Sequence, residues 1–158
     1  MMLMYSLRRA NLNDLGKLID LRVEFLKEHQ NPPTVMEMER FIKTLKDYFL
    51  DKMKSNDFIA WLAESKYDVI ATSGLIFLQK PPHFINLTGK FAYIMNMYTK
   101  PEWRRKGIGL ALLEKLLEEI MKRGIKSVTL HATPAGRPLY EKFGFRGNNG
   151  DKEMKLTL

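Results

Sequence analysis

The sequence predicts an α/β protein with a mixed β-sheet. Segments with apolar residues at helical spacing are interleaved with runs rich in β-branched and aromatic residues. Strands and helices alternate in the later part of the chain, which is typical of this class. Two helical segments also begin with a good capping residue and an acid three positions later. The expected order of elements is β-α-α-β-β-β-α-β-α-β-β.

The first part of the chain predicts one strand and two helices. Residues 4–10 alternate weakly between apolar and polar side chains, as a strand does. Asn11 and the acid three residues later resemble a capping box at the start of the first helix. Thr34 and Glu37 form a second capping box, which opens a helix with its own apolar stripe. That helix is expected to end near residue 54.

The rest of the chain predicts strands with two helices between them. Strands are expected at 57–65, 68–79, 91–99 and 126–132. A helix over 107–123 precedes the last of these, and a short helix capped by Thr133, with Pro134 at its first position, follows it. The final residues predict a hairpin that turns on Asn149 and Gly150. No repeat or linker divides the chain, so we expect one domain over residues 1–158.

Composition excludes several kinds of site. The chain has no cysteine and only three histidines, and no two histidines have metal-site spacing, so we expect no metal. No apolar run reaches the length of a membrane span, and the N-terminus does not resemble a signal peptide, which predicts a cytoplasmic protein without a membrane partner. The net charge of +8 comes from Lys and Arg residues spread along the whole chain, so a solvated basic surface explains it without an anionic partner.

The helix expected after Arg104 begins differently from the others, because no side chain is available to cap it. Arg104, Arg105 and Lys106 lie at the end of the helix that repels positive charge. Gly107 and Gly109 leave its first turn without side chains, so another group can approach the backbone. A bound phosphate would satisfy the free N–H groups and neutralise the cations. A flexible turn capped by water is the simpler alternative, but the combined features favour an anion site.

Two stretches resemble the GNAT superfamily of N-acetyltransferases. The spacing of Arg104, Gly107 and Gly109 between a strand and a helix resembles its acetyl-CoA signature. Residues 130–145, "LHATPAGRPLYEKFGF", resemble its next motif, in the expected order and at the expected separation. The resemblance implies a mostly antiparallel sheet with helices on both faces and acetyl-CoA as co-substrate, without a metal.

The resemblance also implies a set of coenzyme-binding residues. In this family a bulge separates the strand before the signature from the next strand, and the coenzyme lies in the gap. Backbone N–H groups before and within the helix would bind the pyrophosphate, and the preceding strand would pair with the pantetheine arm. The expected residues are Met97, Tyr98, Thr99, Arg104, Arg105, Lys106, Gly107, Ile108, Gly109, Leu110 and His131.

Two residues are candidates for proton transfer. Tyr140 lies where the family commonly places its general acid, and a phenol is a suitable proton source for a thiolate leaving group; otherwise its ring simply packs in the core. Glu24 is the candidate base on the first helix, although a solvated surface charge is the simpler explanation. Arg22 either binds an acceptor carboxylate or is solvated, and His131 either contacts the pantetheine arm or is a packed histidine. Asn96 replaces the carboxylate that many relatives carry in this region, and it cannot act as a base.

The function predicted is transfer of an acetyl group from acetyl-CoA to a primary amine, by direct attack in a ternary complex. The acceptor is a small molecule or a protein amine, and the sequence does not choose between them. A coenzyme-binding sensor without catalysis is one alternative. A basic nucleic-acid-binding protein is a less favoured one, because the sequence lacks an RNA motif and aromatic–basic interleaving. Members of the resembled family often dimerise, so a homodimer stays open, although the sequence fixes no interface.

Overall fold

A computed structural model describes residues 4–147 and 154–158. It contains a five-stranded sheet in which the strands are ordered as they follow along the chain. The three neighbouring pairs from β1 to β4 are antiparallel, and β5 is parallel to β4. The predicted class, a mixed and mostly antiparallel sheet, is confirmed. The strands are β1 (Ser6–Arg9), β2 (Phe58–Glu64), β3 (Val69–Gln79), β4 (Lys90–Thr99) and β5 (Val128–Leu130).

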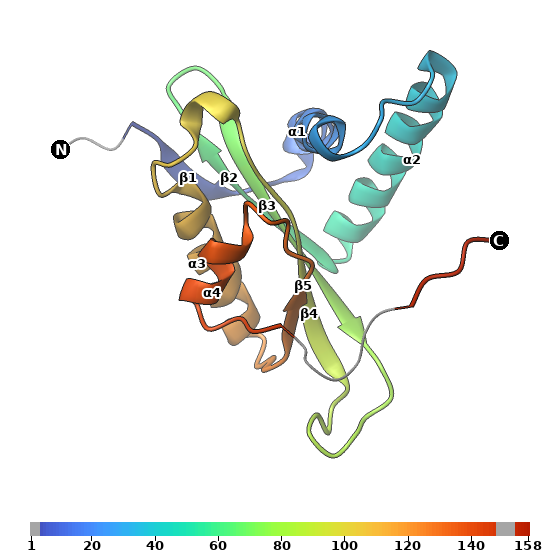
Figure 1. Cartoon of the computed structure of the whole chain (residues 1–158), viewed down its shortest axis with the longest axis vertical. Coiled ribbons are helices and arrows are strands. Elements are labelled where there is room, and N and C mark those ends of the chain that lie inside the picture. The colour runs from blue at the N-terminus through green and yellow to red at the C-terminus, as the bar shows by residue number, and fades with distance from the viewer. Residues whose placement is uncertain (1–3, 148–153) are drawn as a thin grey trace.

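Helices cover both faces of this sheet (Figure 1). Helices α1 and α2 lie on one side of the strands, and α3 and α4 lie on the other. Two single 3-10 turns, η1 and η2, precede α1 and the loop before α3. The helical elements are η1 (Leu12–Asp14), α1 (Leu15–His29), α2 (Val35–Lys54), η2 (Pro101–Trp103), α3 (Ile108–Lys122) and α4 (Arg137–Lys142).

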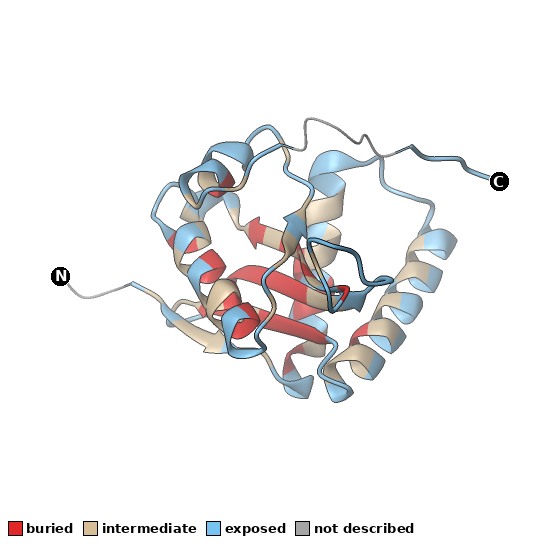
Figure 2. Cartoon of the chain, turned by 90° about the horizontal axis from the view of Figure 1, so that it is seen from below, coloured by how far each residue is buried: buried red, intermediate tan, exposed pale blue. Residues whose placement is uncertain are grey.

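The sheet separates two apolar layers, and its central strands are buried (Figure 2). On one side Leu18 and Leu21 of α1 and Phe49 of α2 pack together on the sheet, each no more than 2% exposed. On the other side Leu113 and Leu116 of α3 are completely buried against β3 and β4. Because both faces are covered, β2, β3 and β4 are almost continuously apolar rather than alternating. This packing fixes the positions of α1 and α3, which carry the expected site residues.

Both predicted capping boxes are present, although the first caps the 3-10 turn η1 that leads into α1, and α1 itself has no side-chain cap. The Asn11 side chain accepts from the Asn13 N–H, and the Asp14 carboxylate accepts from the Asn11 N–H at 2.7 Å. Thr34 and Glu37 form the second box at the start of α2. Each box satisfies backbone donors that the first helical turn leaves free.

The cap predicted at Thr133 was placed too early. The Thr133 hydroxyl accepts from the Gly136 N–H at 3.2 Å, which closes a separate turn over 133–136. Helix α4 begins only at Arg137, so Pro138, and not Pro134, lies in its first turn. A proline is well placed there because the first helical N–H groups have no acceptor within the helix.

The predicted C-terminal hairpin has no counterpart in the described residues. Residues 145–147 and 154–158 form no strand, and the five terminal residues are all exposed. A strand needs a hydrogen-bonded neighbour, and residues 154–158 have none among the described residues. The expected turn at Asn149 and Gly150 lies outside these residues. Among the described helices, none is both long and apolar enough to cross a membrane.

Candidate active site

Strand β4 contains a bulge near its middle. The pairing register with β3 shifts between Thr72 and Gly74. Two residues of β4, Asn96 and Met97, therefore lie opposite the single residue Ser73, which is the arrangement of a β-bulge. Asn96 has a positive φ of 54°, a conformation that asparagine adopts more readily than most residues with a side chain. The bulge bends β4 and changes the direction of the backbone after it.

Beyond the bulge, one edge of β4 is open. Strand β5 pairs with β4 only as far as Ile94, so no described strand lies beside residues 95–99 on that edge. The Lys100 N–H donates to the Ile70 carbonyl of β3 at 2.9 Å. Lys100 therefore directs its backbone N–H toward β3. Since alternate residues of a strand direct their backbone groups to opposite sides, the backbone groups of Met97 and Thr99 face the open edge. These two residues lie where the coenzyme arm was expected.

The start of α3 has no side-chain cap, as the sequence predicted. Its N-cap is Gly107 with φ 79°, and Arg105 also has a positive φ, of 63°. The Ala111 N–H donates to the Gly107 carbonyl at 3.1 Å. The N–H groups before Ala111 therefore have no acceptor four residues back within α3. Together with the helix dipole, these donors make this end of the helix suited to binding an anion.

The cations around this helix start differ in their partners. Arg105 and Lys106 are exposed and form no ion pair with any described residue, and the Lys106 ammonium lies 4.7 Å from the ring centroid of Trp103. Arg104 instead donates through Nε to the Thr99 carbonyl at 2.8 Å, and its Nη2 contacts both carboxylate oxygens of Glu28. The side chain of Arg104 therefore links the end of β4 to α1.

The first turn of α3 packs against α4. Ile108 is buried, and Leu110 is 39% exposed. A side chain at Gly109 would begin 3.4 Å from Leu139 of α4. A β-branched residue at Gly109 would therefore push against the helix that carries Tyr140, and would not act on ligand binding alone.

Tyr140 lies in the apolar layer beneath the open edge. It is 8% exposed and belongs to the same apolar cluster as Met97 and Leu130. Its ring meets Phe145 edge-on, with 5.9 Å between centroids. Burial raises the pKa of the Tyr140 phenol above its ordinary value, so this side chain keeps its proton at neutral pH.

Tyr98 is placed differently from its two neighbours on the strand. It pairs with Thr72 of β3, and its side chain packs in the layer under α1. Its hydroxyl proton is shared between Glu28, at 3.1 Å, and Glu24, at 3.3 Å. Burial first, and then the hydrogen bond to Glu28, raises the pKa of Tyr98 to about 12. Tyr98 thus holds the carboxylate of the expected base Glu24 and does not face the open edge.

Polar residues from four separate segments gather on the α1 side of the bulge. Arg22 donates through Nη1 to Asn96 Oδ1 at 2.7 Å. The exposed His131, directly after β5, has its Nδ1 2.7 Å from the Tyr93 hydroxyl. Tyr93 on β4 and Tyr48 on α2 are both close enough to affect the pKa of Arg22. Sequence reasoning did not single out these two tyrosines, because each lies within an otherwise ordinary apolar stripe.

The model of the Acetyltransferase (GNAT) family matches residues 22–145. That stretch includes α1, the bulge, the start of α3 and Tyr140.

The chain belongs to the GNAT family of acetyltransferases.

Individual GNAT relatives agree with this assignment. A predicted acetyltransferase of Clostridium acetobutylicum, solved with acetyl-CoA, is 33% identical and superposes with a TM-score of 0.86 over 96% of both chains. The ribosomal protein bS18-alanine N-acetyltransferase of Escherichia coli is 39% identical over 57 residues, 34% of this chain and 38% of that protein. The glucosamine 6-phosphate N-acetyltransferase of Trypanosoma brucei brucei is 31% identical over 77 residues, 49% of this chain and 51% of that protein. The matches thus span 38% of the length of the Escherichia coli relative and 51% of that of the Trypanosoma relative.

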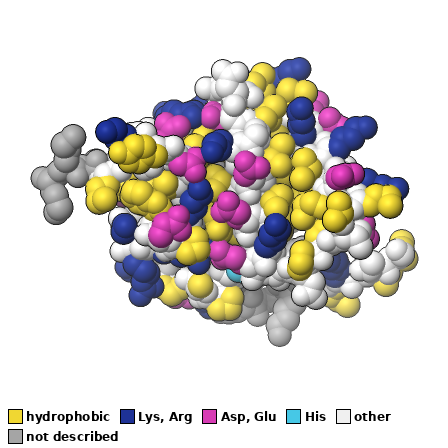
Figure 3. All heavy atoms as spheres, turned by 90° about the horizontal axis from the view of Figure 1, so that it is seen from above, with side chains coloured by type: hydrophobic (Ala, Val, Ile, Leu, Met, Phe, Trp, Pro, Cys, Tyr) yellow, Lys and Arg dark blue, Asp and Glu magenta, His cyan; other side chains and the backbone are white. Residues whose placement is uncertain are grey.

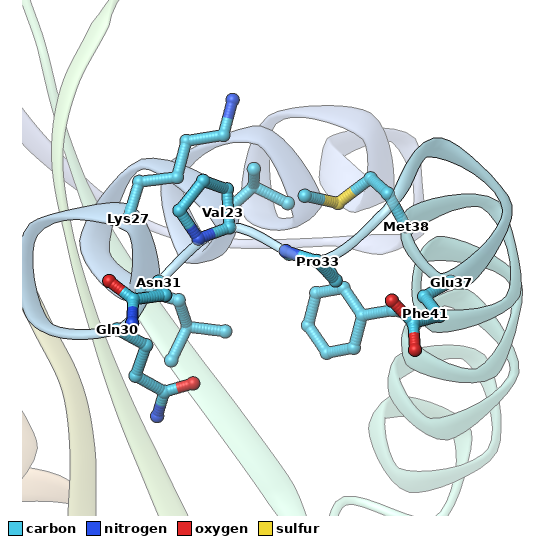
Figure 4. Close-up of a pocket in the computed structure, with 10 residues that line it drawn as sticks. Val23, Lys27, Gln30, Asn31, Pro33, Glu37, Met38 and Phe41 are labelled. Carbon is cyan, nitrogen blue, oxygen red and sulfur yellow. The ribbon is translucent and has the colours of Figure 1, made fainter.

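A separate hollow lies between the end of α1 and the start of α2 (Figure 4). It has a volume of about 240 Å³ and a mostly apolar lining that includes Val23, Met38 and Phe41. None of the expected coenzyme residues lines it. The candidate active site is therefore the open edge of β4 and the start of α3, and not this hollow.

Proposed function

We propose that the chain transfers the acetyl group of acetyl-CoA to a primary amine. The observation that carries this proposal is the juxtaposition of two features: the uncapped start of α3 and the open backbone edge of β4 after the bulge. One feature suits a pyrophosphate and the other suits an extended amide-containing arm. Coenzyme A contains both groups, and the Clostridium relative was solved with acetyl-CoA.

Each part of the coenzyme has a matching set of protein groups. The N–H groups of residues 105–110 bind the pyrophosphate oxygens, with Arg105 and Lys106 supplying positive charge. The backbone of Met97 and Thr99 pairs with the pantetheine amides. Arg104 contributes by holding the Thr99 carbonyl and Glu28, so it fixes the geometry of the site through neighbouring groups.

The reaction proceeds by direct attack of the amine. The neutral amine adds to the thioester carbonyl carbon, and an N–H group of β4 stabilises the negative charge that forms on the oxygen. The C–S bond then breaks, and the coenzyme A thiolate takes a proton from the Tyr140 hydroxyl. The proton that the amine loses passes to Glu24, directly or through water. Before the next turnover Tyr140 recovers its proton from solvent, and Glu24 releases its own to solvent.

Two alternative functions make different predictions. A non-catalytic sensor would bind acetyl-CoA without consuming it, but the buried, protonated Tyr140, in the same apolar cluster as Met97, favours catalysis. A nucleic-acid-binding protein would need a continuous basic surface. On the face seen in Figure 3, acidic and basic side chains are mixed, which does not favour that reading.

The proposal is tested by incubating the purified protein with acetyl-CoA and a broad panel of amines. The panel includes amino acids, amino sugar phosphates, aminoglycosides, polyamines and peptides with a free N-terminus. Thiol release is followed in parallel with mass spectrometry of the amine. The expected result is one acetylated amine for each thiol released. Binding of acetyl-CoA without acceptor-dependent thiol release would support the sensor instead.

The order of the chemical steps is tested by initial velocities. Direct attack in a ternary complex predicts intersecting lines when both substrates are varied. Parallel lines would instead indicate an acetyl-enzyme intermediate. The absence of cysteine from the chain already removes the thiol nucleophile that such an intermediate would most readily use.

A further inference from the structure

Arg22 is an unusually placed cation in this protein. Its guanidinium group is half-buried between α1 and the bulge of β4. Its hydrogen bond is to the neutral amide oxygen of Asn96, and its planar group lies 5.7 Å from the ring centroid of Phe25. No described carboxylate forms an ion pair with it. By contrast, Arg8 and Arg104 each contact a carboxylate oxygen at 2.6 Å.

A half-buried cation without a counter-anion is costly to maintain. Burial lowers the pKa of Arg22, and the ionisable side chains that oppose this effect are the phenols of Tyr93 and Tyr48. A guanidinium group has five N–H donors, and the bond to Asn96 occupies only part of this capacity. The remaining donors have no described protein acceptor. A ligand that supplies an oxyanion would therefore satisfy both the charge and the hydrogen bonds.

The surroundings of Arg22 are suited to such a ligand. Tyr48 of α2 and Tyr93 of β4 lie close enough to affect the pKa of Arg22, and His131 Nδ1 lies 2.7 Å from the Tyr93 hydroxyl. Asn96, which holds Arg22, directly precedes Met97 at the open edge of β4. The cluster therefore lies on the α1 side of the strand to which we assign the thioester. An amine that reaches the thioester from this side would pass next to Arg22.

We propose that Arg22 binds an oxyanion of the acceptor, so that the substrate is a small amine that also carries a carboxylate or phosphate group. This inference rests on the proposed acetyl transfer and adds the substrate class. The planar guanidinium group can bind two oxygens of either anion at once. A polycationic amine would instead bring positive charge toward an unneutralised arginine and is disfavoured.

The test compares pairs of amines that differ by the anionic group. β-Alanine is paired with propylamine for the carboxylate, and phosphoethanolamine with ethanolamine for the phosphate. Spermidine represents a polycation, and rates are compared at equal concentrations of the neutral amine. A charge-assisted hydrogen bond predicts that kcat/KM for the anionic member exceeds that of its partner by about 10- to 100-fold. The arm with the larger ratio identifies the anion.

Variants separate recognition from a structural role. Arg22→Gln should remove the preference by slowing the anionic member and leaving its neutral partner nearly unchanged, and Arg22→Lys should retain part of it. Asn96→Asp places a carboxylate against the guanidinium group and should also reduce the preference for the anionic amine. Aspartate tolerates the positive φ of position 96, so the bulge should be retained. Lys27→Gln is the matched control, because it removes one positive charge from an exposed position on the same helix.

Several results would overturn the inference while leaving acetyl transfer intact. Equal kcat/KM within both pairs, a preference for spermidine, or turnover of other amines but of neither anionic one would do so. An equal loss toward both members of a pair in Arg22→Gln would show that Arg22 only ties α1 to the bulge. If the protein acetylates no amine at all, the proposed function fails, and this inference fails with it.

Discussion

Arg104 contacts both carboxylate oxygens of Glu28, at 2.6 and 2.8 Å, across 76 positions of the chain. The same guanidinium group donates to the Thr99 carbonyl. One side chain thereby joins three parts of the site: the loop before α3, the open edge of β4, and α1. Its charge is used within the protein, which leaves Arg105 and Lys106 as the cations available to the coenzyme.

Glu28→Gln tests this linking role. The pair is partly exposed, with side chains 41% and 34% accessible, so its loss should cost only about 0–1 kcal/mol of unfolding free energy. The loop before α3 should nevertheless become less fixed, and the Kd for acetyl-CoA should rise by about three- to ten-fold, a modest coupling of under 1.4 kcal/mol. Calorimetric titration and urea denaturation measure the two quantities. Glu118→Gln, which removes a pair on α3 away from the site, is the control. An unchanged Kd in Glu28→Gln would contradict the role.

Tyr140→Phe tests the proposed general acid. The variant keeps the ring against Phe145 and removes only the hydroxyl group. The expected result is a fall in kcat of about 100-fold or more, the usual contribution of a positioned acid, with an unchanged Kd for acetyl-CoA. Tyr67→Phe, at an exposed position, is the control. Equal kcat, with the chemical step shown to be rate-limiting, would remove Tyr140 from the mechanism.

The pH dependence of kcat gives a second test of Tyr140. A raised pKa means that the phenol stays protonated to higher pH than an ordinary tyrosine. The Tyr140-dependent part of kcat should therefore be present at neutral pH and lost only as the pH rises through the raised pKa, above about 10. If kcat of the parent already declined as the pH was raised from 7 to 9, and kcat of Tyr140→Phe did not, this assignment would be contradicted.

Gly107→Asn tests the start of α3. An asparagine tolerates the left-handed φ of 79°, and its side chain would enter open space ahead of the helix. The fold should be retained, but a side chain in the space assigned to the pyrophosphate should weaken acetyl-CoA binding by about ten-fold or more, equivalent to 1.4 kcal/mol. Gly124→Asn is the matched control, since it has a similar φ at the other end of α3 and is equally open. Equal Kd values for both variants would contradict the placement.

Asp68 predicts an acid-sensitive contribution to stability. Its carboxylate binds Lys17 of α1 at 2.6 Å and Lys100 after β4 at 2.8 Å. The hydrogen bond from Lys100, followed by that from Lys17, lowers the pKa of Asp68 well below its usual range. Because the folded pKa is lowered, the stabilisation is complete above the unfolded pKa of about 3.9 and is lost as the pH falls below it. Urea denaturation from pH 6 to pH 2 should show parent and Asp68→Asn converging at low pH. A difference that stays constant would contradict the prediction.

Local signals predicted the parts of the fold that depend on neighbouring residues. Asn11 caps the 3-10 turn that leads into α1, and Thr34 caps α2, through bonds that span only two or three residues, so the sequence carries the necessary information. The missing cap at Gly107 could be recognised for the same reason. Thr133 was assigned to the wrong turn, because a hydroxyl that closes a separate turn has the same sequence pattern as one that caps a helix.

Features that depend on distant partners could not be predicted in the same way. The ion pair between Arg104 and Glu28 joins segments that only the packed sheet brings together. The position of the bulge depends on which β3 residue lies opposite Asn96. The sequence did not decide whether Arg22 is solvated or binds an acceptor carboxylate. Its half-buried position beside Asn96 appears only when α1 is placed on the sheet.

The placement of acetyl-CoA is tested most directly by backbone amide chemical shifts, recorded while acetyl-CoA is added to the labelled protein. The account predicts that the largest changes occur in residues 105–110 and at Met97 and Thr99, with smaller changes in Glu28 and Tyr98. It also predicts that Gly107→Asn reduces these changes at the same acetyl-CoA concentration. Largest changes around the hollow of Val23, Met38 and Phe41, or spread over scattered surface lysines, would contradict it.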